Sequence, residues 1–345
     1  MELVNITSPK KRNNALNTLK ILAALQVLFG HARVHLNVQV PDPLVKLFDL
    51  FMGVPIFFIL SGFLIWKSTG KSKSFGDYAF KRFIRIYPEL WLGVLVEILV
   101  LLVLFKEKIN WVMLAAFTFT QSTILQFWTP DFLRSYGCGT PNGTLWTIGI
   151  TIQFYLLAWL LNKVLAGKGI YRWGAALGIS LVIKALNPII KDILPELVSK
   201  LYSQTILPYL WMFVFGALLS EYQEKIIPHL RKWWWLLLAA SVIIRFANFD
   251  IDSDSYGVLT YMFRVAGFIG LCYNIPVLNI SFDISYGLFI YHMIVVNAMI
   301  ELGFTGQWYH LVIVATMSVI LASLSTIFGN YIAYKLKNKT VREKQ

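Results

Sequence analysis

A lysine and two histidines share one face of the first apolar segment of the sequence. Lys20 and His31 are eleven residues apart, and eleven steps of about 100° make three helical turns plus about 20°. The two side chains therefore lie on one side of a helix, about 16 Å apart along its axis, and His35 continues that face. Histidine is suited to proton transfer near neutral pH, so His31 is a candidate general base. The alternatives are a helix–helix hydrogen bond for His31 and snorkelling to lipid headgroups for Lys20.

A basic motif occupies residues 81–88, with the sequence Lys-Arg-Phe-Ile-Arg-Ile-Tyr-Pro. Arg82 and Arg85 are three residues apart, so they share a helix face, and arginine pairs in that geometry suit phosphate groups. Anchoring of the helix at the cytoplasmic surface is the alternative. Anchoring explains the basic charge but not the Arg-x-x-Arg spacing.

Two further segments place small and polar groups within apolar runs. Residues 53–65 contain Ser61 and Gly62, which either allow close helix packing or open a gap beside a ligand. Residues 285–292 begin with Ser285 and end with a second imidazole, His292. Two histidines in separate membrane helices favour a site over a purely structural role. The sequence contains no Gly-rich phosphate loop and no metal-ligand motif, which disfavours an ATP-driven pump and predicts no metal.

The elements that must position these residues are transmembrane helices. Of the 345 residues, 57% are hydrophobic and 14% are charged, whereas soluble domains are about a quarter charged. Apolar runs recur along the chain, and a run of about 20 residues is long enough to span a bilayer. We predict an all-α polytopic membrane protein, a single transmembrane domain over residues 1–345. About ten spans are expected, at residues 15–36, 49–68, 86–105, 144–163, 171–188, 202–220, 231–248, 257–274, 284–302 and 308–334.

Charge decides how these helices are oriented. Residues 110–127 are apolar enough for an eleventh span, but counting them would place the basic C-terminal tail outside. As a re-entrant or interfacial segment, they leave about two-thirds of the Lys and Arg residues on the cytoplasmic side, as the positive-inside rule requires. Both termini are then cytoplasmic, and the acidic loop at residues 248–255 is outside. The net charge of +13 needs no nucleic-acid partner.

These four motifs resemble the membrane-bound acyltransferase-3 family of bacterial O-acetyltransferases. The family's first-helix pattern, a basic residue, ten residues and then a histidine, is matched by Lys20 and His31. Its glycine-initiated FF-x-L-S-G-F-L-I run is matched by residues 53–65. Its R-x-x-R-I-Y-P-x-x-W signature is matched by residues 82–91, and its S-Y-x-L-Y-x-x-H signature by residues 285–292.

The sequence departs from the family pattern at three positions. Phe289 replaces the second tyrosine of the last signature, and Lys20 replaces the commoner arginine. Members usually have L-W-S-L-x-x-E at the segment that begins here with Leu145 and Trp146, and Thr151 occupies the acidic position. A proton relay through that carboxylate is therefore not expected to operate in the same way.

The resemblance implies transfer of an acetyl group from cytoplasmic acetyl-CoA to a hydroxyl of a lipid-linked or polymeric cell-surface saccharide such as O-antigen, in the bacterial inner membrane. It implies a catalytic His31, with Lys20, acting as general base or as an acyl-imidazole carrier. It implies no metal and no appended extracytoplasmic domain. The donor-binding residues would be Lys81, Arg82, Arg85 and Tyr87, and the pocket-lining residues Ser61, Gly62, Trp146, Ser285 and His292.

Two other interpretations remain open on the sequence. A transporter or flippase for a lipid-linked saccharide explains the spans and the buried histidines, but it gives no reason for the Arg-x-x-Arg spacing. A catalytically inactive relative that serves as a binding subunit is suggested by Thr151. Only an enzyme would consume the thioester.

Overall fold

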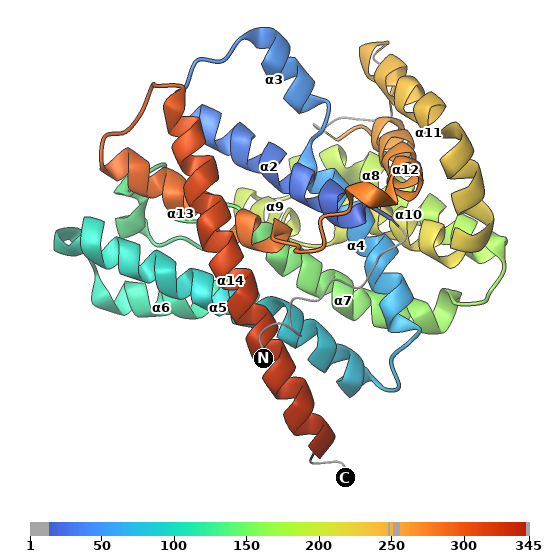
Figure 1. Ribbon diagram of the computed structural model, residues 1–345, viewed down its shortest axis with the longest axis horizontal. Coiled ribbons are helices and arrows are strands. Elements are labelled where there is room, and N and C mark those ends of the chain that lie inside the picture. The colour runs from blue at the N-terminus through green and yellow to red at the C-terminus, as the bar shows by residue number, and fades with distance from the viewer. Residues whose placement is uncertain (1–13, 248, 251–255, 343–345) are drawn as a thin grey trace.

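The computed structural model describes residues 14–342 apart from 248 and 251–255, and within these ranges it contains helices and no strand (Figure 1). The basic residues before position 14, and Asp252 and Asp254 of the predicted outer loop, lie outside the described residues. The α-helices are α2 (Leu16–His35), α3 (Asp42–Asp49), α4 (Gly53–Thr69), α5 (Phe75–Leu104), α6 (Trp111–Gln121), α7 (Trp146–Leu165), α8 (Ile170–Ile193), α9 (Glu196–Tyr202), α10 (Leu210–Glu221), α11 (Gln223–Phe246), α12 (Val258–Asn274), α13 (Ser285–Glu301) and α14 (Tyr309–Arg342).

Each of the ten predicted ranges overlaps a helix, but the range 202–220 includes the end of α9 and a break before α10 begins at Leu210. Helix α5 begins well before its predicted start at residue 86. Its first residue is Phe75, because the Ser74 hydroxyl accepts the backbone N–H of Asp77 at 3.2 Å and caps the helix. Lys81 then donates to the Asp77 carboxylate one turn away, at 2.7 Å. The whole basic motif therefore lies inside a helix.

Five segments are long and apolar enough to cross a membrane, which indicates a membrane protein, and a sixth is added if α9 and α10, bent by 47°, form one broken span. The ten predicted spans are thus not confirmed. Helices α12 and α13 have 17 residues each, about 26 Å of helix against a hydrocarbon core of about 30 Å. The five segments are Asp42–Thr69, Phe75–Leu104, Trp146–Leu165, Ile170–Ile193 and Tyr309–Asn338.

The predicted re-entrant or interfacial segment contains α6, a short apolar helix. Its 11 residues extend about 17 Å, too little to span a bilayer. The helix lies beside α5 (Figure 1), with which it is in contact. Its length fits the prediction that residues 110–127 are not a complete span.

Glycines bring α4 and α10 into backbone contact. A Cβ atom on Gly62 would lie 2.1 Å from the Phe213 carbonyl oxygen, and one on Gly216 would lie 1.9 Å from the Ile59 carbonyl oxygen. No larger residue fits at either position without moving a helix. Gly62 therefore faces α10. Of the two roles expected for this residue, the structure shows close helix packing and not a gap beside a ligand.

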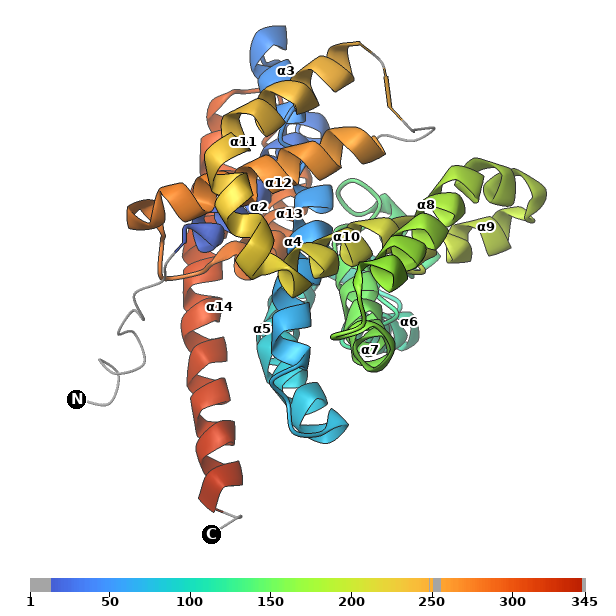
Figure 2. The same cartoon turned by 90° about the vertical axis from the view of Figure 1, so that its right-hand side faces the viewer.

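Helix α13 is enclosed by its neighbours and lies at the centre of the site described below. It contacts α2, α5 and α14, and 13 of its 17 residues are buried. Gly287 allows the close approach of α14, because a Cβ there would lie 2.7 Å from Ala322 Cα. Beyond this contact α14 continues as a long rod towards the C-terminus (Figure 2).

Candidate active site

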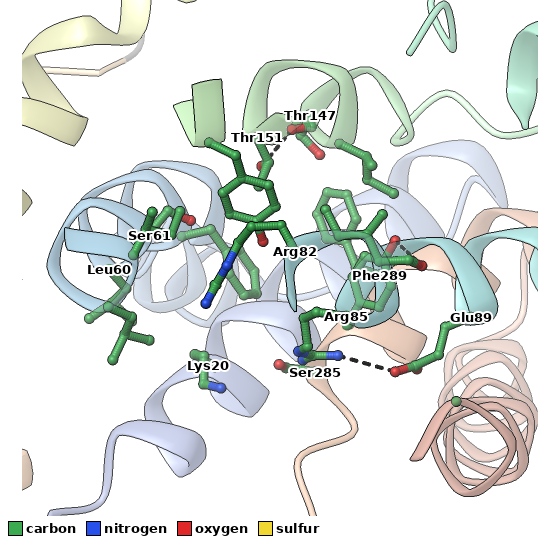
Figure 3. A pocket seen from close by; sticks show the side chains of 18 of the residues that line it. Lys20, Leu60, Ser61, Arg82, Arg85, Glu89, Thr147, Thr151, Ser285 and Phe289 are labelled. Atoms are coloured by element: carbon green, nitrogen blue, oxygen red, sulfur yellow. Dashed lines mark hydrogen bonds and ion pairs between the residues drawn. The ribbon is translucent and has the colours of Figure 1, made fainter. Parts of the chain in front are cut away.

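A charged cluster joins α2, α5 and the start of α13. Lys20 of α2 forms an ion pair with Asp283, whose Oδ1 accepts the Ser285 hydroxyl at 2.6 Å and the Ser285 backbone N–H at 3.2 Å. From α5, Arg85 Nη2 lies 3.9 Å from Asp283 Oδ2, and Arg85 Nη1 donates to Glu89 at 3.1 Å (Figure 3). One carboxylate thus connects elements that are far apart in the sequence.

Asp283 was missed by the sequence analysis. Burial alone would raise the pKa of its carboxyl, but Lys20 and Arg85 outweigh burial and lower this pKa from 3.8 to about 2. The group is therefore an anion at neutral pH. The signal that predicts it is its place two residues before α13, where the helix dipole and free amides favour an acidic residue.

A cavity of about 550 Å³ opens beside this cluster, between α2, α4, α5, α7, α13 and α14 (Figure 3). Its wall combines cationic groups with apolar side chains that include Phe57, Leu60, Leu64, Ile65 and Phe289. The cationic side chains are Lys20, Lys81, Arg82, Arg85 and Lys337. Of the predicted site residues, the cavity brings together Lys20, Ser61, Lys81, Arg82, Arg85 and Ser285.

Arg82 differs from the other cations of α5 that line the cavity, because none of the described carboxylates forms an ion pair with it. Its Nη2 donates to the Ser68 hydroxyl, and its guanidinium carbon lies 5.6 Å and 5.3 Å from the ring centres of Tyr78 and Tyr155. Thr151, at the position where the family pattern has an acidic residue, also lines the cavity. The wall therefore carries a hydroxyl in place of that negative charge.

The two histidines form a hydrogen-bonded pair between α2 and α13. His31 Nδ1 lies 3.0 Å from His292 Nε2, and the rings are stacked with centres 5.3 Å apart. His292 Nδ1 lies 2.9 Å from the Leu288 carbonyl oxygen, and His292 is fully buried. The two ring contacts of His292 fix its orientation from both sides.

These contacts also decide which nitrogens carry protons when both rings are neutral. A carbonyl oxygen only accepts, so His292 Nδ1 donates to Leu288 and His292 Nε2 is left as an acceptor. His31 Nδ1 must then donate to His292 Nε2. His31 Nε2 is consequently the nitrogen without a proton. A base oriented by a second group in this way has the geometry expected for acid–base or nucleophilic catalysis.

Phe289 connects the cavity to the histidine pair. Its ring lines the cavity and lies edge-on to His292, with ring centres 5.9 Å apart. Phe57, also in the cavity wall, packs against Phe289 at 5.8 Å. His292, a predicted pocket residue, is thus one aromatic side chain behind the wall.

The structure places three other predicted residues outside the cavity wall. Gly62 packs against α10, as described above. Tyr87 stacks between Phe83 at 4.8 Å and Trp91 at 5.5 Å, on the exposed side of α5. Trp146 lies behind the wall, with its ring 6.3 Å from that of Phe58. Tyr87 and Trp146 therefore pack against neighbouring aromatic side chains and do not line the cavity.

A loop that the sequence analysis did not single out binds α13 on either side of His292. Asn142 Nδ2 donates to the Ile290 carbonyl oxygen at 2.9 Å, and the Thr144 hydroxyl donates to the Phe289 carbonyl oxygen at 3.2 Å. Farther along the helix, Asn297 Oδ1 accepts the Cys138 N–H at 2.7 Å. Irregular segments give no periodic signal, so nothing in the sequence pointed to these contacts.

Within the described residues, no group of three or more His, Cys, Asp or Glu side chains has a metal-binding arrangement.

Comparisons with known proteins agree with the resemblance drawn from the motifs. Nodulation protein 10 of Rhizobium leguminosarum bv. viciae is 29% identical over 362 aligned residues, which cover 98% of this chain and 97% of the relative. The O-acetyl transferase of Shigella phage Sf6 is 27% identical, over 95% of this chain and 96% of the relative. Peptidoglycan O-acetyltransferase OatA of Listeria monocytogenes is 26% identical over only 35% of this chain and 23% of that protein.

No solved structure matches the chain significantly. A family model described as an acyltransferase domain matches residues 13–334, which include both histidines, Asp283 and the basic motif of α5. The prediction of an acyltransferase is thereby confirmed. The chain belongs to the acyltransferase-3 family.

Proposed function

We propose that this acyltransferase moves an acetyl group from cytoplasmic acetyl-CoA to a hydroxyl of a cell-surface saccharide, such as a lipid-linked or polymeric O-antigen. One observation carries the proposal. A cation-lined cavity is joined, through Phe289, to a histidine pair that leaves His31 Nε2 free to accept a proton. The names of two relatives, an O-acetyl transferase and a peptidoglycan O-acetyltransferase, support acetyl as the group and a glycan as the acceptor.

The cavity fits an acyl-CoA donor in the character of its wall. Such a donor carries phosphates at one end and an uncharged thioester at the other. Arg82 binds the phosphates, supported by Lys81, Arg85 and Lys20, because guanidinium and ammonium groups form charge-assisted hydrogen bonds with phosphate oxygens. The apolar wall that includes Phe289 faces the uncharged part of the donor.

His31 carries the chemical step in one of two ways. As general base, its Nε2 accepts the proton of the acceptor hydroxyl while the hydroxyl oxygen attacks the thioester carbonyl. The carbon–sulfur bond breaks, and the imidazolium returns the proton to the thiolate, which leaves an ester and a thiol. As carrier, His31 Nε2 attacks the thioester carbonyl, the carbon–sulfur bond breaks, and CoA leaves as the thiolate. The acceptor hydroxyl oxygen then attacks the acetyl-imidazole, the carbon–nitrogen bond breaks, and the hydroxyl proton goes to the thiolate, which again leaves an ester, a thiol and a free imidazole. Both routes need an unprotonated Nε2, which is the tautomer that the His292 contact favours.

The proposal includes a topology of ten spans in the bacterial inner membrane, with both termini cytoplasmic and residues 110–127 re-entrant, within one transmembrane domain. It is supported by the helices found at all ten ranges. Spans of 17 residues are tolerated where neighbouring helices enclose them, as they enclose α13. Single cysteines introduced at Asn37 and at Lys73 test it, because membrane-impermeant reagents should label the first from outside and the second from inside.

Transfer of label tests the function directly. Purified protein in lipid nanodiscs, given acetyl-CoA labelled in the acetyl group and a panel of lipid-linked and polymeric glycans, should release one thiol for each acetyl ester formed. Transport of the saccharide without consumption of the thioester would support the flippase interpretation instead. Acetyl-CoA binding without transfer to any acceptor in the panel would favour an inactive binding subunit.

A further inference from the structure

The last turns of α14 form one wall of the cavity, which the motifs gave no reason to expect. Asn330, Ala333 and Lys337 line the cavity and are spaced by three and four residues, so they follow one face of the helix. Lys337 lies beyond residue 334, where the match to the family model ends. Its place in the cavity wall is observed in the structure and is not implied by the family match.

Glu89 of α5 fixes the position of this helix face. The Thr326 hydroxyl donates to Glu89 Oε2 at 3.3 Å, and a Cβ on Gly329 would lie 2.6 Å from Glu89 Cγ. Glu89 is itself buried and accepts from Arg85. The same carboxylate thus binds the Arg-x-x-Arg motif and holds α14 against α5, so the turns that follow Gly329 run along the cavity.

The cavity cations differ in how far their charge is already neutralised. Lys20 and Arg85 share Asp283, Arg85 also pairs with Glu89, and Lys81 pairs with Asp77. In the part of the chain that the structure describes, neither Arg82 nor Lys337 forms an ion pair with a carboxylate. An anion that enters the cavity therefore meets these two cations without displacing a described carboxylate.

We infer that Lys337 is a donor-binding residue, which together with Arg82 binds the phosphate groups of acyl-CoA. The inference rests on the proposed function, because it takes the donor to be an acyl-CoA. Phosphate is the chemistry that both cations recognise, and an anionic lipid headgroup is the other source of phosphate near the end of a membrane helix. Anchoring by the positive-inside rule makes no distinction between Lys337 and its neighbour Lys335.

The matched pair Lys337→Gln and Lys335→Gln tests the inference in nanodiscs. Lys335 lies over the Tyr331 ring at 4.8 Å and is not in the cavity wall. Loss of a charge-assisted contact should weaken acetyl-CoA binding, measured by calorimetry, about tenfold in Lys337→Gln, with Lys335→Gln unchanged. Transfer from S-acetylpantetheine, which lacks the adenosine phosphates, should be the same in both variants and the wild type.

Three results would overturn the inference that Lys337 binds the donor. They are unchanged acetyl-CoA binding in Lys337→Gln, an equal loss in both variants, and a loss that appears in phosphatidylglycerol nanodiscs but not in phosphatidylcholine. The last result would assign Lys337 to lipid headgroups. If the wild type binds acetyl-CoA through Lys337 but acetylates nothing, the inference stands and the proposed function fails; a wild type that binds no acetyl-CoA overturns both.

Discussion

The cavity and the histidine pair share two helices, α2 and α13, but they differ in charge and in exposure. Lys20 and Arg85 line the cavity and pair with Asp283 beside it, and the Arg85 side chain is 44% exposed. In the histidine pair, His292 is fully buried and both its ring nitrogens have partners. Several cations share the cavity wall, whereas one nitrogen, His31 Nε2, is left for proton transfer. On the proposed function, donor binding would be distributed over many groups and the chemistry concentrated in one.

The largest effect is expected at His31. His31→Ala removes the only group to which we assign proton or acyl transfer, so the initial rate of acetylation should fall by about 10²–10⁴-fold. His229→Ala, which changes an exposed histidine on α11, should keep the wild-type rate. An unaltered rate in a folded His31→Ala protein would remove the distinction between the two regions.

A smaller loss is expected at His292, which positions His31. His292→Leu removes the acceptor for the His31 Nδ1 proton, and the misplacement of the base should lower kcat on the order of 10²-fold. His292→Gln offers a carbonyl acceptor and should recover part of this loss. Because the chain has five histidines, ¹⁵N-histidine NMR can report the His31 tautomer in each variant. We expect a mixture of His31 tautomers in His292→Leu and a single tautomer in His292→Gln. Identical spectra for the two variants would mean that His292 only packs the helices.

Asp283→Asn changes the charged cluster beside the cavity and leaves the histidine pair intact. It leaves Lys20 and Arg85 beside a neutral amide, which should lower the free energy of unfolding in detergent by roughly 3 kcal/mol. The pKa of the Asp283 carboxyl is lowered in the folded protein, so its stabilisation is complete above the ordinary value of 3.8 and is lost as the pH falls towards about 2. Thermal unfolding between pH 5 and pH 2 should show this decline to be shallower in the variant. Parallel pH profiles for the two proteins would show that Asp283 is not an anion in the fold.

The smallest effect separates the two arginines of the basic motif. Arg82→Gln should raise KM for acetyl-CoA about tenfold with kcat unchanged, because Arg82 has no described carboxylate partner. Arg85→Gln leaves Glu89 and Asp283 without a shared cation and should lower thermal stability more than donor affinity. Equal changes in KM and in stability for the two variants would mean that the ion pairs do not set their roles.

The positions of the helices were accessible from the sequence, because apolar runs of sufficient length have few alternatives to helix. The early start of α5 was not, since its first turns carry Lys81, Arg82 and Arg85 and look like a surface loop until the Ser74 cap is considered. The face of α5 that lines the cavity could be predicted in part from the sequence. Tyr87 follows Arg85 by two residues, a rotation of about 200°, so a helix that includes both already places them on opposite faces.

The acidic partners and the role of α14 were not accessible, because they depend on contacts between distant segments. Lys20 and Asp283 are 263 residues apart, and Thr326 and Glu89 are 237 apart. Either pairing requires knowledge of which helices are neighbours. The pairing of His31 with His292 has the same origin: both residues were singled out by type, but only the packing of α2 against α13 brings them together.

Lys20–Asp283 joins α2 to the residue two positions before α13, and His31–His292 joins α2 to α13 itself, so the two ends of the site are expected to be energetically coupled. A slip of α13 by one residue, about 1.5 Å and 100°, would separate both pairs at once. A ligand that stabilises the charged end therefore stabilises the imidazole geometry as well, and by reciprocity an ordered His31 strengthens the charged end. On the proposed function, the thioester would then meet an aligned base whenever it is bound.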